Sequence, residues 1–167
     1  AVEMLAYVLP EDKLDGMLVY TADKNGEGDR YFCKDGKIQR ESDDGSRDSR
    51  YPKEDDHELD VPLAVLVNGN SASASEVFTG AVMDYDAGIV VGTTTFGKGI
   101  VQNLIPLGDG TAIKLTTAHY YTPNGFDLHG KGLEPDVVVE MDEELQKKAV
   151  VELSEDNQLQ AAIEAMN

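Results

Sequence analysis

Residues 61–85 have the sequence VPLAVLVNGNSASASEVFTGAVMDY, and this stretch decides the fold. Its first seven residues are nearly all apolar, which is typical of a strand buried on both faces of a parallel sheet. An Asn-Gly-Asn at 68–70 ends the strand, and the apolar residues that follow recur with a period near 3.6, which predicts a helix over 71–85. A second buried strand over 87–92 gives a strand-helix-strand unit. The sequence therefore predicts a layered α/β fold with a right-handed crossover.

Downstream of this unit, alternating apolar residues over 99–107 and 111–122 predict two longer strands around a Gly-Asp-Gly turn. One more strand is expected over 137–141. Helices are expected at about 142–151, starting near Asp142, and at 156–166.

Upstream, residues 1–9 form an amphipathic pattern that Pro10 ends, so they predict a helix. Because this helix opens without a cap residue of its own, the chain is expected to be a piece of a longer one. Runs over 16–20 and 30–33 flank an Asn-Gly pair at 25–26, which indicates a β-hairpin.

Residues 40–60 hold nine acidic and four basic residues and hardly any apolar side chain. Such a stretch buries too little surface to offset its ordering entropy, so an exposed, mobile loop is predicted. The alternative is a calcium site, but the twelve-residue spacing and central glycine of an EF-hand are missing. Its oxygen ligands would come from Asp43, Asp44, Asp55, Asp56 and Glu58.

The 167 residues correspond to one ordinary domain, and their 32 acidic and 14 basic residues give a formal net charge of -18. This charge repels phosphate backbones and anionic membrane surfaces, so nucleic acid is not expected as a partner. No apolar run reaches the roughly 20 residues that span a bilayer, and the N-terminus lacks the pattern of a signal peptide. The single cysteine, Cys33, is expected to be a free thiol.

Ser73 lies between a buried strand and a helix, where α/β folds present nucleophiles and ligands. The unpaired N–H groups beside a serine at a helix start can stabilise a developing oxyanion. Taken alone, however, the Ser73-Ala74-Ser75-Glu76 sequence equally fits a capping box, in which Ser73 and Glu76 each bind the other's backbone. The local sequence leaves both interpretations open.

A nucleophilic serine needs a base, and the three histidines, His57, His119 and His129, fit structural positions better. Lys98 is the other candidate, since flanking glycines permit a tight turn at the end of a buried strand. A lysine of ordinary pKa, about 10.4, is protonated at pH 7, and burial or a neighbouring cation is needed to make it neutral. The hypothesis that Lys98 is a base therefore requires a buried site. The alternative, an ordinary lysine in a turn, requires no particular environment.

Residues 92–98 also match the G-x-x-x-x-G-K pattern of a phosphate-binding loop. The next residue is Gly99, where magnesium coordination needs Ser or Thr. The sequence after it indicates a strand, whereas a phosphate-binding loop must open a helix. Nucleotide binding is therefore not expected.

Several motifs occur in one order between residues 61 and 140 and together resemble the C-terminal processing peptidases, also called tail-specific proteases, which use a Ser-Lys dyad. The motifs are VPLAVLVN (61–68), SASASE (71–76), TTFGKGIVQ (94–102), YYTPNG (120–125) and GLEPDV (132–137). The resemblance implies that Ser73 is the nucleophile and Lys98 the general base. It also implies that Gln102 helps hold the lysine and that the Ala74 N–H is one oxyanion donor.

By this resemblance the fold is a crotonase- and Clp-like mixed β/α superhelical protease core. The family's Asn-Pro-Gly-Gly motif, which gives a second oxyanion donor, and its PDZ domain are not recognisable in the sequence. Residues 1–167 are therefore expected to form the later part of one catalytic domain, incomplete at its N-terminal side, with an acidic loop over 40–60 and a helical segment over 142–167.

The resemblance implies a serine endopeptidase that cuts polypeptides near their C-termini, with apolar tails as substrates, no cofactor or metal, and an extracytoplasmic location. Reduced or no activity is expected of this chain, and self-association could complete its sheet. The alternative is a non-catalytic peptide-binding or scaffold domain of the same fold.

Overall fold

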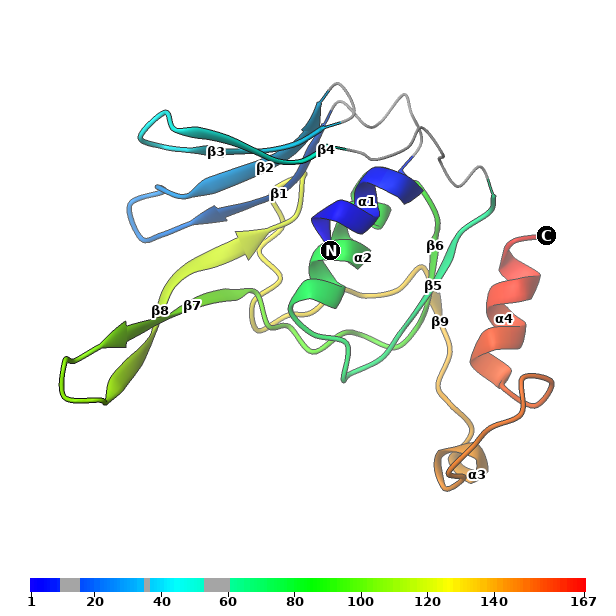
Figure 1. Ribbon diagram of the computed structural model, residues 1–167. Coiled ribbons are helices and arrows are strands. Elements are labelled where there is room, and N and C mark those ends of the chain that lie inside the picture. Colours follow the sequence, from blue (N-terminus) through cyan, green and yellow to red (C-terminus); the bar gives the residue numbers. More distant parts are fainter. Residues whose placement is uncertain (10–15, 35–36, 53–60) are drawn as a thin grey trace.

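In the computed structural model, which describes residues 1–9, 16–34, 37–52 and 61–167, two helices lie between two sheets (Figure 1). The helices are α1 (Val2–Val8), α2 (Ala74–Asp84), α3 (Glu143–Gln146) and α4 (Asn157–Ala165). The strands are β1 (Met17–Ala22), β2 (Asp29–Lys34), β3 (Lys37–Ser42), β4 (Arg47–Pro52), β5 (Ala64–Val67), β6 (Ile89–Gly92), β7 (Ile100–Pro106), β8 (Ala112–Tyr121) and β9 (Val137–Val138).

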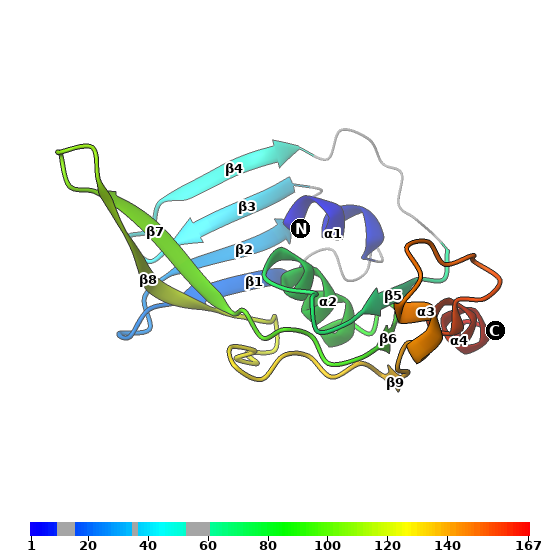
Figure 2. The ribbon, with the colours of Figure 1, turned by 90° about the horizontal axis from the view of Figure 1, so that it is seen from below.

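The larger sheet has six strands in the order β4-β3-β2-β1-β8-β7, and each neighbouring pair is antiparallel. The two predicted hairpins, β1–β2 and β7–β8, are both confirmed, and Gly26 in the first turn has the positive φ that its Asn-Gly pair predicts. Figure 2 shows the β7–β8 hairpin extending away from the helices. The pairing of β1 with β8 joins the two hairpins into one sheet.

The smaller sheet is parallel, in the order β5-β6-β9, and α2 connects β5 to β6. This is the predicted strand-helix-strand unit. The prediction that the first strand is buried on both faces is wrong, because Leu66 is 45% exposed while Val67 is buried. β5 is the outer strand of only three, so part of its surface stays open.

The prediction of an unstructured acidic loop over 40–60 is wrong for residues 40–52, which form the β3–β4 hairpin. Charged side chains of this segment form ion pairs with β2. Asp43, in the turn of the hairpin, binds Arg30 (2.7 Å), and Arg40 of β3 binds Asp29 (2.8 Å). The Arg30 guanidinium and the Gly28 N–H hold the pKa of Asp43 below its ordinary value. The segment is thus ordered by strand pairing, with ion pairs to β2 at its surface.

The calcium alternative finds no support in the part of the hairpin that the structure describes. Asp43 is engaged by Arg30, and Asp44 accepts a hydrogen bond from the Ser46 N–H (2.8 Å) within the turn. Across the described residues no cluster of acidic, histidine or cysteine side chains has the geometry of a metal site. The other acidic candidates, at 55, 56 and 58, lie outside the described residues.

The C-terminal segment is less helical than its sequence predicts. The first predicted helix shortens to α3, and Val150 and Leu153, which follow it, are exposed. α4 forms as predicted, with the Asp156 carboxylate accepting hydrogen bonds from the backbone N–H groups of Gln158 and Leu159 (both 3.0 Å). None of the described helices combines the length and apolar character needed to cross a bilayer.

The core lies where α1 and α2 pack against the six-stranded sheet. Leu5 and Leu9 of the predicted apolar stripe of α1 are at most 1% exposed. They meet Leu18 of β1 and Val82 of α2, both fully buried. Cys33 is unbridged, as expected, and is buried in this same core.

Replacement of Leu5 by Ala tests this core. Because Leu5 is fully buried, Leu5→Ala is expected to lower the free energy of unfolding by about 2–5 kcal/mol. The matched control is Met4→Ala, since the neighbouring Met4 is 60% exposed, and its effect is expected to stay within about 0.5 kcal/mol. Urea unfolding measures both, and equal losses would contradict the assigned core.

Candidate active site

The loop between β5 and α2 is a turn held by its own polar groups. The Ser71 N–H donates to the Asn68 carbonyl (2.8 Å), and the Ser71 hydroxyl accepts from the Asn68 N–H (3.1 Å). Ser71 is therefore a turn residue, and the helix predicted over 71–85 begins only at Ala74. The turn leads the chain directly into Ser73, the N-cap of α2.

Ser73 has a strained backbone. Its φ is 56° and its ψ is -112°, and among the described non-glycine residues only Asp86 also has a positive φ. Such a conformation costs on the order of 1–3 kcal/mol and persists only where surrounding structure enforces it. In α/β-hydrolases, a strained strand-to-helix turn presents the serine nucleophile.

Glu76 supplies the surrounding structure. Its side chain is fully buried, and Oε1 accepts hydrogen bonds from the Thr95 hydroxyl (2.6 Å) and the Gly97 N–H (2.6 Å). Oε2 accepts from the N–H groups of Lys98 (2.8 Å) and Ser73 (2.9 Å). Burial of a carboxylate is costly unless donors compensate it, and four donors surround this one.

The Glu76 carboxylate brings the two predicted dyad residues together. Because the Ser73 and Lys98 N–H groups donate to the same oxygen, their nitrogens lie within two hydrogen-bond lengths of each other. A further hydrogen bond, from the Phe96 N–H to the Ser71 carbonyl (2.9 Å), joins the same two loops. Ser73 and Glu76 thus occupy capping-box positions, and the carboxylate also reaches well beyond the helix.

Residues 130–133 form hydrogen bonds with the segment that carries Lys98. The Thr95 hydroxyl accepts from the Leu133 N–H (2.8 Å), and the Gly130 N–H donates to the Gly97 carbonyl (2.9 Å). Gly97 has φ 82°, and a Cβ at this position would lie 2.8 Å from the Gly132 nitrogen. Only glycine fits there, so the glycine before Lys98 allows close backbone packing.

Lys98 itself is exposed, so the described residues do not provide the buried site that a neutral lysine requires. Thr95, Gly97 and Gly99 are buried, and Phe96 and Lys98, which alternate with them, are exposed. The glycines on either side of Lys98 thus face the interior, and the lysine lies at the surface.

Gln102 lies on β7, four residues after Lys98. Its amide donates to the Thr116 hydroxyl on β8 (3.3 Å), and no hydrogen bond to Lys98 occurs in the described part of the chain. A register irregularity separates Val101 from Gln102 in this pairing. The role that the resemblance assigns to Gln102 stays a prediction.

Ala74 is the first residue of α2 and is exposed. Its N–H has no acceptor among the described residues, as expected for the first turn of a helix. The donor therefore remains available next to Ser73, where an oxyanion would develop.

Two histidines form a cluster with an acidic residue at the base of the β7–β8 hairpin. His119 Nδ1 lies 3.2 Å from Asp127 Oδ2, and the rings of His119 and His129 meet edge to face. Partial burial raises the pKa of Asp127, but hydrogen bonds from the His129 N–H and the His119 ring leave it below its ordinary value. These contacts agree with the structural positions predicted for both residues. His57 lies outside the described residues.

The strand that follows Lys98 bears on the phosphate-binding alternative. β7 begins at Ile100, so a strand and not a helix follows the glycine-rich segment. A phosphate-binding loop needs a helix N-terminus at this point. The geometry therefore gives no support to nucleotide binding.

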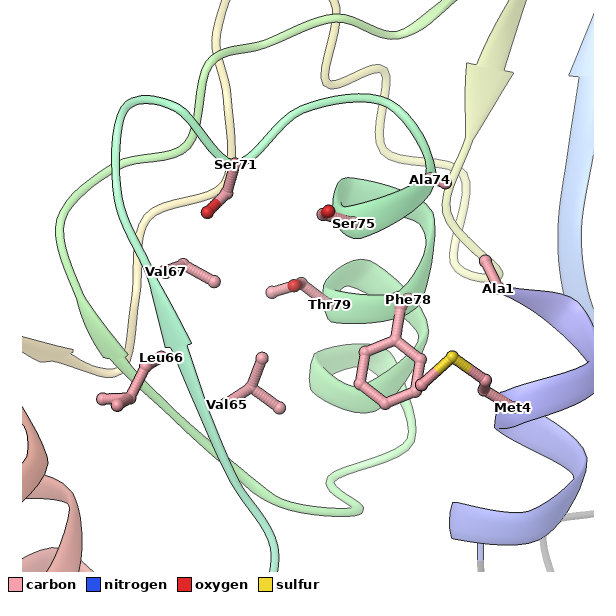
Figure 3. Close-up of a pocket in the computed structure, with 10 residues that line it drawn as sticks. All are labelled: Ala1, Met4, Val65, Leu66, Val67, Ser71, Ala74, Ser75, Phe78 and Thr79. Atoms are coloured by element: carbon pink, nitrogen blue, oxygen red, sulfur yellow. The ribbon is translucent and has the colours of Figure 1, made fainter.

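An apolar groove of about 320 Å³ lies between β5, the first half of α2 and the start of α1 (Figure 3). Val65 and Leu66 of β5, Phe78 of α2 and Met4 of α1 contribute most of its side chains, and Figure 3 shows Met4 next to Phe78. Ser71 reaches this groove, but Ser73 does not line it. The outer edge of β5 forms one wall.

The sequence did not single out Thr95, and it indicated only a capping role for Glu76. A Glu at the third position of a helix is a common cap, so its local pattern carries no sign of burial. The hydrogen bonds of Glu76 to the Thr95–Lys98 segment span 19 to 22 residues. Only the folded chain brings these groups together.

Comparison with known proteins gives a consistent result. The model of peptidase family S41 matches residues 1–139. A carboxy-terminal-processing protease of Bartonella bacilliformis is 54% identical over 79 residues, which are 47% of this chain and 18% of that protein. A Staphylococcus epidermidis protein named "Probable CtpA-like serine protease" is 52% identical over 80 residues, which are 48% of this chain and 16% of that protein.

Among solved structures, a photosystem II D1 C-terminal processing protease superimposes with a TM-score of 0.60 and 34% identity. The match covers 83% of this chain and 30% of that one. The chain thus spans less than a fifth of the curated relatives and less than a third of that structure.

Replacement of Thr95 tests the hydrogen bonds around Glu76. Thr95→Val keeps the side-chain shape but leaves the Leu133 N–H without its acceptor and Glu76 Oε1 with one donor fewer. The free energy of unfolding is expected to fall by about 1–3 kcal/mol. Thr95→Ser keeps the hydroxyl and is expected to lose less. Equal losses in urea unfolding would show that the Thr95 hydroxyl contributes nothing.

Proposed function

The chain belongs to peptidase family S41, and we propose that it carries the nucleophile and base of a serine endopeptidase, Ser73 and Lys98. The observation that supports this proposal is the strained Ser73 at the start of α2, which the buried Glu76 ties to the backbone of Lys98. Residues 1–167 would then form part of one catalytic domain.

In the proposed reaction, neutral Lys98 removes the proton of the Ser73 hydroxyl as the serine oxygen attacks the peptide carbonyl. The Ala74 N–H donates to the oxyanion that develops on that carbonyl. The C–N bond then breaks, and Lys98 returns the proton to the leaving amine. Water hydrolyses the acyl-enzyme by the reverse route and restores both residues.

The exposure of Lys98 adds a condition to this mechanism. Burial disfavours the charged form of a lysine, and water at its ammonium group does the opposite. The proposed base therefore acts when a bound polypeptide or further protein segment excludes water from it. Gln102, on the strand that follows, is proposed to orient Lys98 in that closed state.

The substrates are proposed to be polypeptides with apolar C-terminal tails. Two of the relatives described above are named for processing of C-termini, which supports cleavage near a chain end. An extracytoplasmic location, which the resemblance implies, is part of the same proposal. No cofactor takes part in the proposed steps.

The exposure of Lys98 also favours a second function, a non-catalytic peptide-binding or scaffold domain of the same fold. A lysine whose side chain stays in water lacks the burial that the peptidase mechanism requires of it. The two functions differ in one respect: only the peptidase forms a covalent bond through Ser73.

Cleavage of an unstructured polypeptide with an apolar C-terminus tests the proposal, with mass spectrometry as the readout. Ser73→Ala and Lys98→Ala are each expected to lower the rate by roughly 10³-fold or more. Two exposed residues far from the site, Lys114 and Ser154, give the matched controls Lys114→Ala and Ser154→Ala. Cleavage that persists in Ser73→Ala would contradict the proposed nucleophile, and binding without cleavage would favour the second function.

Self-association is proposed to complete the smaller sheet. The outer edge of β5 has no strand partner among the described elements, and the apolar groove of Figure 3 runs beside it. An open edge of this kind pairs readily with a strand of another chain. Analytical ultracentrifugation is expected to show a dimer that Leu66→Lys dissociates; a monomer at all concentrations would contradict the proposal.

A further inference from the structure

Residues 127–133 form a turn that folds back from the end of β8 toward the segment that carries Lys98. An antiparallel bridge between Tyr121 and Asp127 begins the turn. Leu128 is 1% exposed, and its carbonyl accepts hydrogen bonds from the N–H groups three and four residues later (3.1 and 2.9 Å). The 127–133 turn is therefore held in the interior by Leu128.

This turn touches both of the glycines that flank Lys98. The Gly130 N–H donates to the Gly97 carbonyl (2.9 Å). A Cβ at Gly99 would lie 2.9 Å from the His129 nitrogen, so the two backbones are in close contact there as well. The backbone on both sides of the proposed base therefore depends on where the turn lies.

The Asp127 carboxylate ties the turn to β8. Its Oδ1 accepts a hydrogen bond from the His129 N–H (3.0 Å), and its Oδ2 lies 3.2 Å from Nδ1 of His119 on β8. Partial burial raises the pKa of Asp127, but these two hydrogen bonds leave it below its ordinary value. An ionised carboxylate only accepts, so the His119 ring donates through Nδ1. One side chain thus connects the residue packed on Gly99 to β8.

β8 receives this connection next to the lysine segment. His119 pairs with Ile100, which is the first residue of β7 and the second after Lys98. The next N–H of β8, that of Tyr120, donates to the Gly99 carbonyl (2.9 Å). Gly99 therefore lies between β8 and the turn. A carboxylate that joins β8 to the turn fixes both of these contacts.

We propose that Asp127 is a positioning residue for Lys98, which acts through the turn packed against Gly97 and Gly99. This role rests on the proposed function, in which Lys98 is the base. Glu76 binds the Lys98 N–H, whereas Asp127 fixes the backbone on either side of it. A displacement of about 1 Å can lower a catalytic rate by about 100-fold. The position of the turn therefore governs how well Lys98 meets the serine.

Hydrogen exchange of single backbone N–H groups, followed by NMR, tests this role on the chain itself. Asp127→Ala removes two hydrogen bonds to a charged group and is expected to speed exchange of the Lys98 N–H by about tenfold. The Ser73 N–H donates to the same oxygen of Glu76 from α2, and its rate is expected to stay unchanged. Asp127→Asn keeps an acceptor for the His129 N–H and is expected to restore most of the protection.

The matched control is Asp109→Ala, at the tip of the β7–β8 hairpin. Asp109 is exposed and also accepts a backbone hydrogen bond, from the Thr111 N–H (2.9 Å). Exchange of the Lys98 N–H in this variant is expected to equal that of the unchanged chain. Where Asp127→Ala does not fold, His119→Phe decides, because it keeps a ring and removes only the donor to Oδ2. It is expected to speed the same exchange by at least about threefold.

The rate of Ser73 modification measures whether this position matters for the reaction. With a peptidyl diphenyl phosphonate, the Ser73 oxygen forms a bond to phosphorus, and one phenol leaves with the serine proton. Intact mass spectrometry follows the product. Asp127→Ala is expected to lower the maximal rate about tenfold, while the half-saturating concentration stays within about twofold. A residue that served only stability would change neither value in the folded chain.

The outcomes separate the positioning role from the proposed function. Unchanged exchange of the Lys98 N–H in folded Asp127→Ala, or an equal increase at Ser73, overturns the positioning role whatever the chemistry of the site. An unchanged maximal rate of modification in that variant overturns it too. No modification of Ser73 in the unchanged chain overturns the proposed function, and the role of Asp127 in the reaction falls with it.

Discussion

The buried carboxylate of Glu76 is the interaction on which the site depends. Its four hydrogen bonds come from the start of α2 and from the segment that precedes β7. A carboxylate with no exposed surface is stable only when these donors are in place, so the two segments are ordered together. The strained Ser73 is held because its N–H is one of the donors. The strained backbone of Ser73 and the ordering of the segment before β7 therefore both depend on Glu76.

The larger sheet places further groups around that centre. β1 and β8 pair in its middle, which brings the upstream hairpins next to the strands that follow the lysine. α1 and α2 fill the space between this sheet and the parallel one (Figure 1). Ser73 thus faces strands that are distant in sequence, and a cavity beside it has walls from β1, β2, β7 and β8. Ion pairs of Arg30 with Asp43 and of Arg40 with Asp29 link β2 to the β3–β4 hairpin at the surface of this sheet.

Periodicity predicted the elements that local sequence controls. The helix at α1, the strand-helix-strand unit and both glycine-turn hairpins follow from apolar spacing and turn residues. The β3–β4 hairpin did not follow, because Arg30 and Arg40 find their carboxylate partners 13 and 11 residues away. Motif resemblance singled out Ser73 and Lys98, and the fold brings their backbones together. The burial of Glu76 and the exposure of Lys98 depend on tertiary packing, so no local pattern could predict them.

Backbone position and solvent exclusion are separate requirements of a Ser-Lys pair, and the described chain meets the first. Hydrogen bonds to Glu76 fix the N–H groups of Ser73 and Lys98, and the close packing of Gly97 fixes the backbone before Lys98. Lys98 nevertheless is exposed, between two buried glycines. Chemistry that needs a neutral lysine must then await whatever covers Lys98. In the proposed mechanism, such an arrangement couples the action of Lys98 to occupancy of the site.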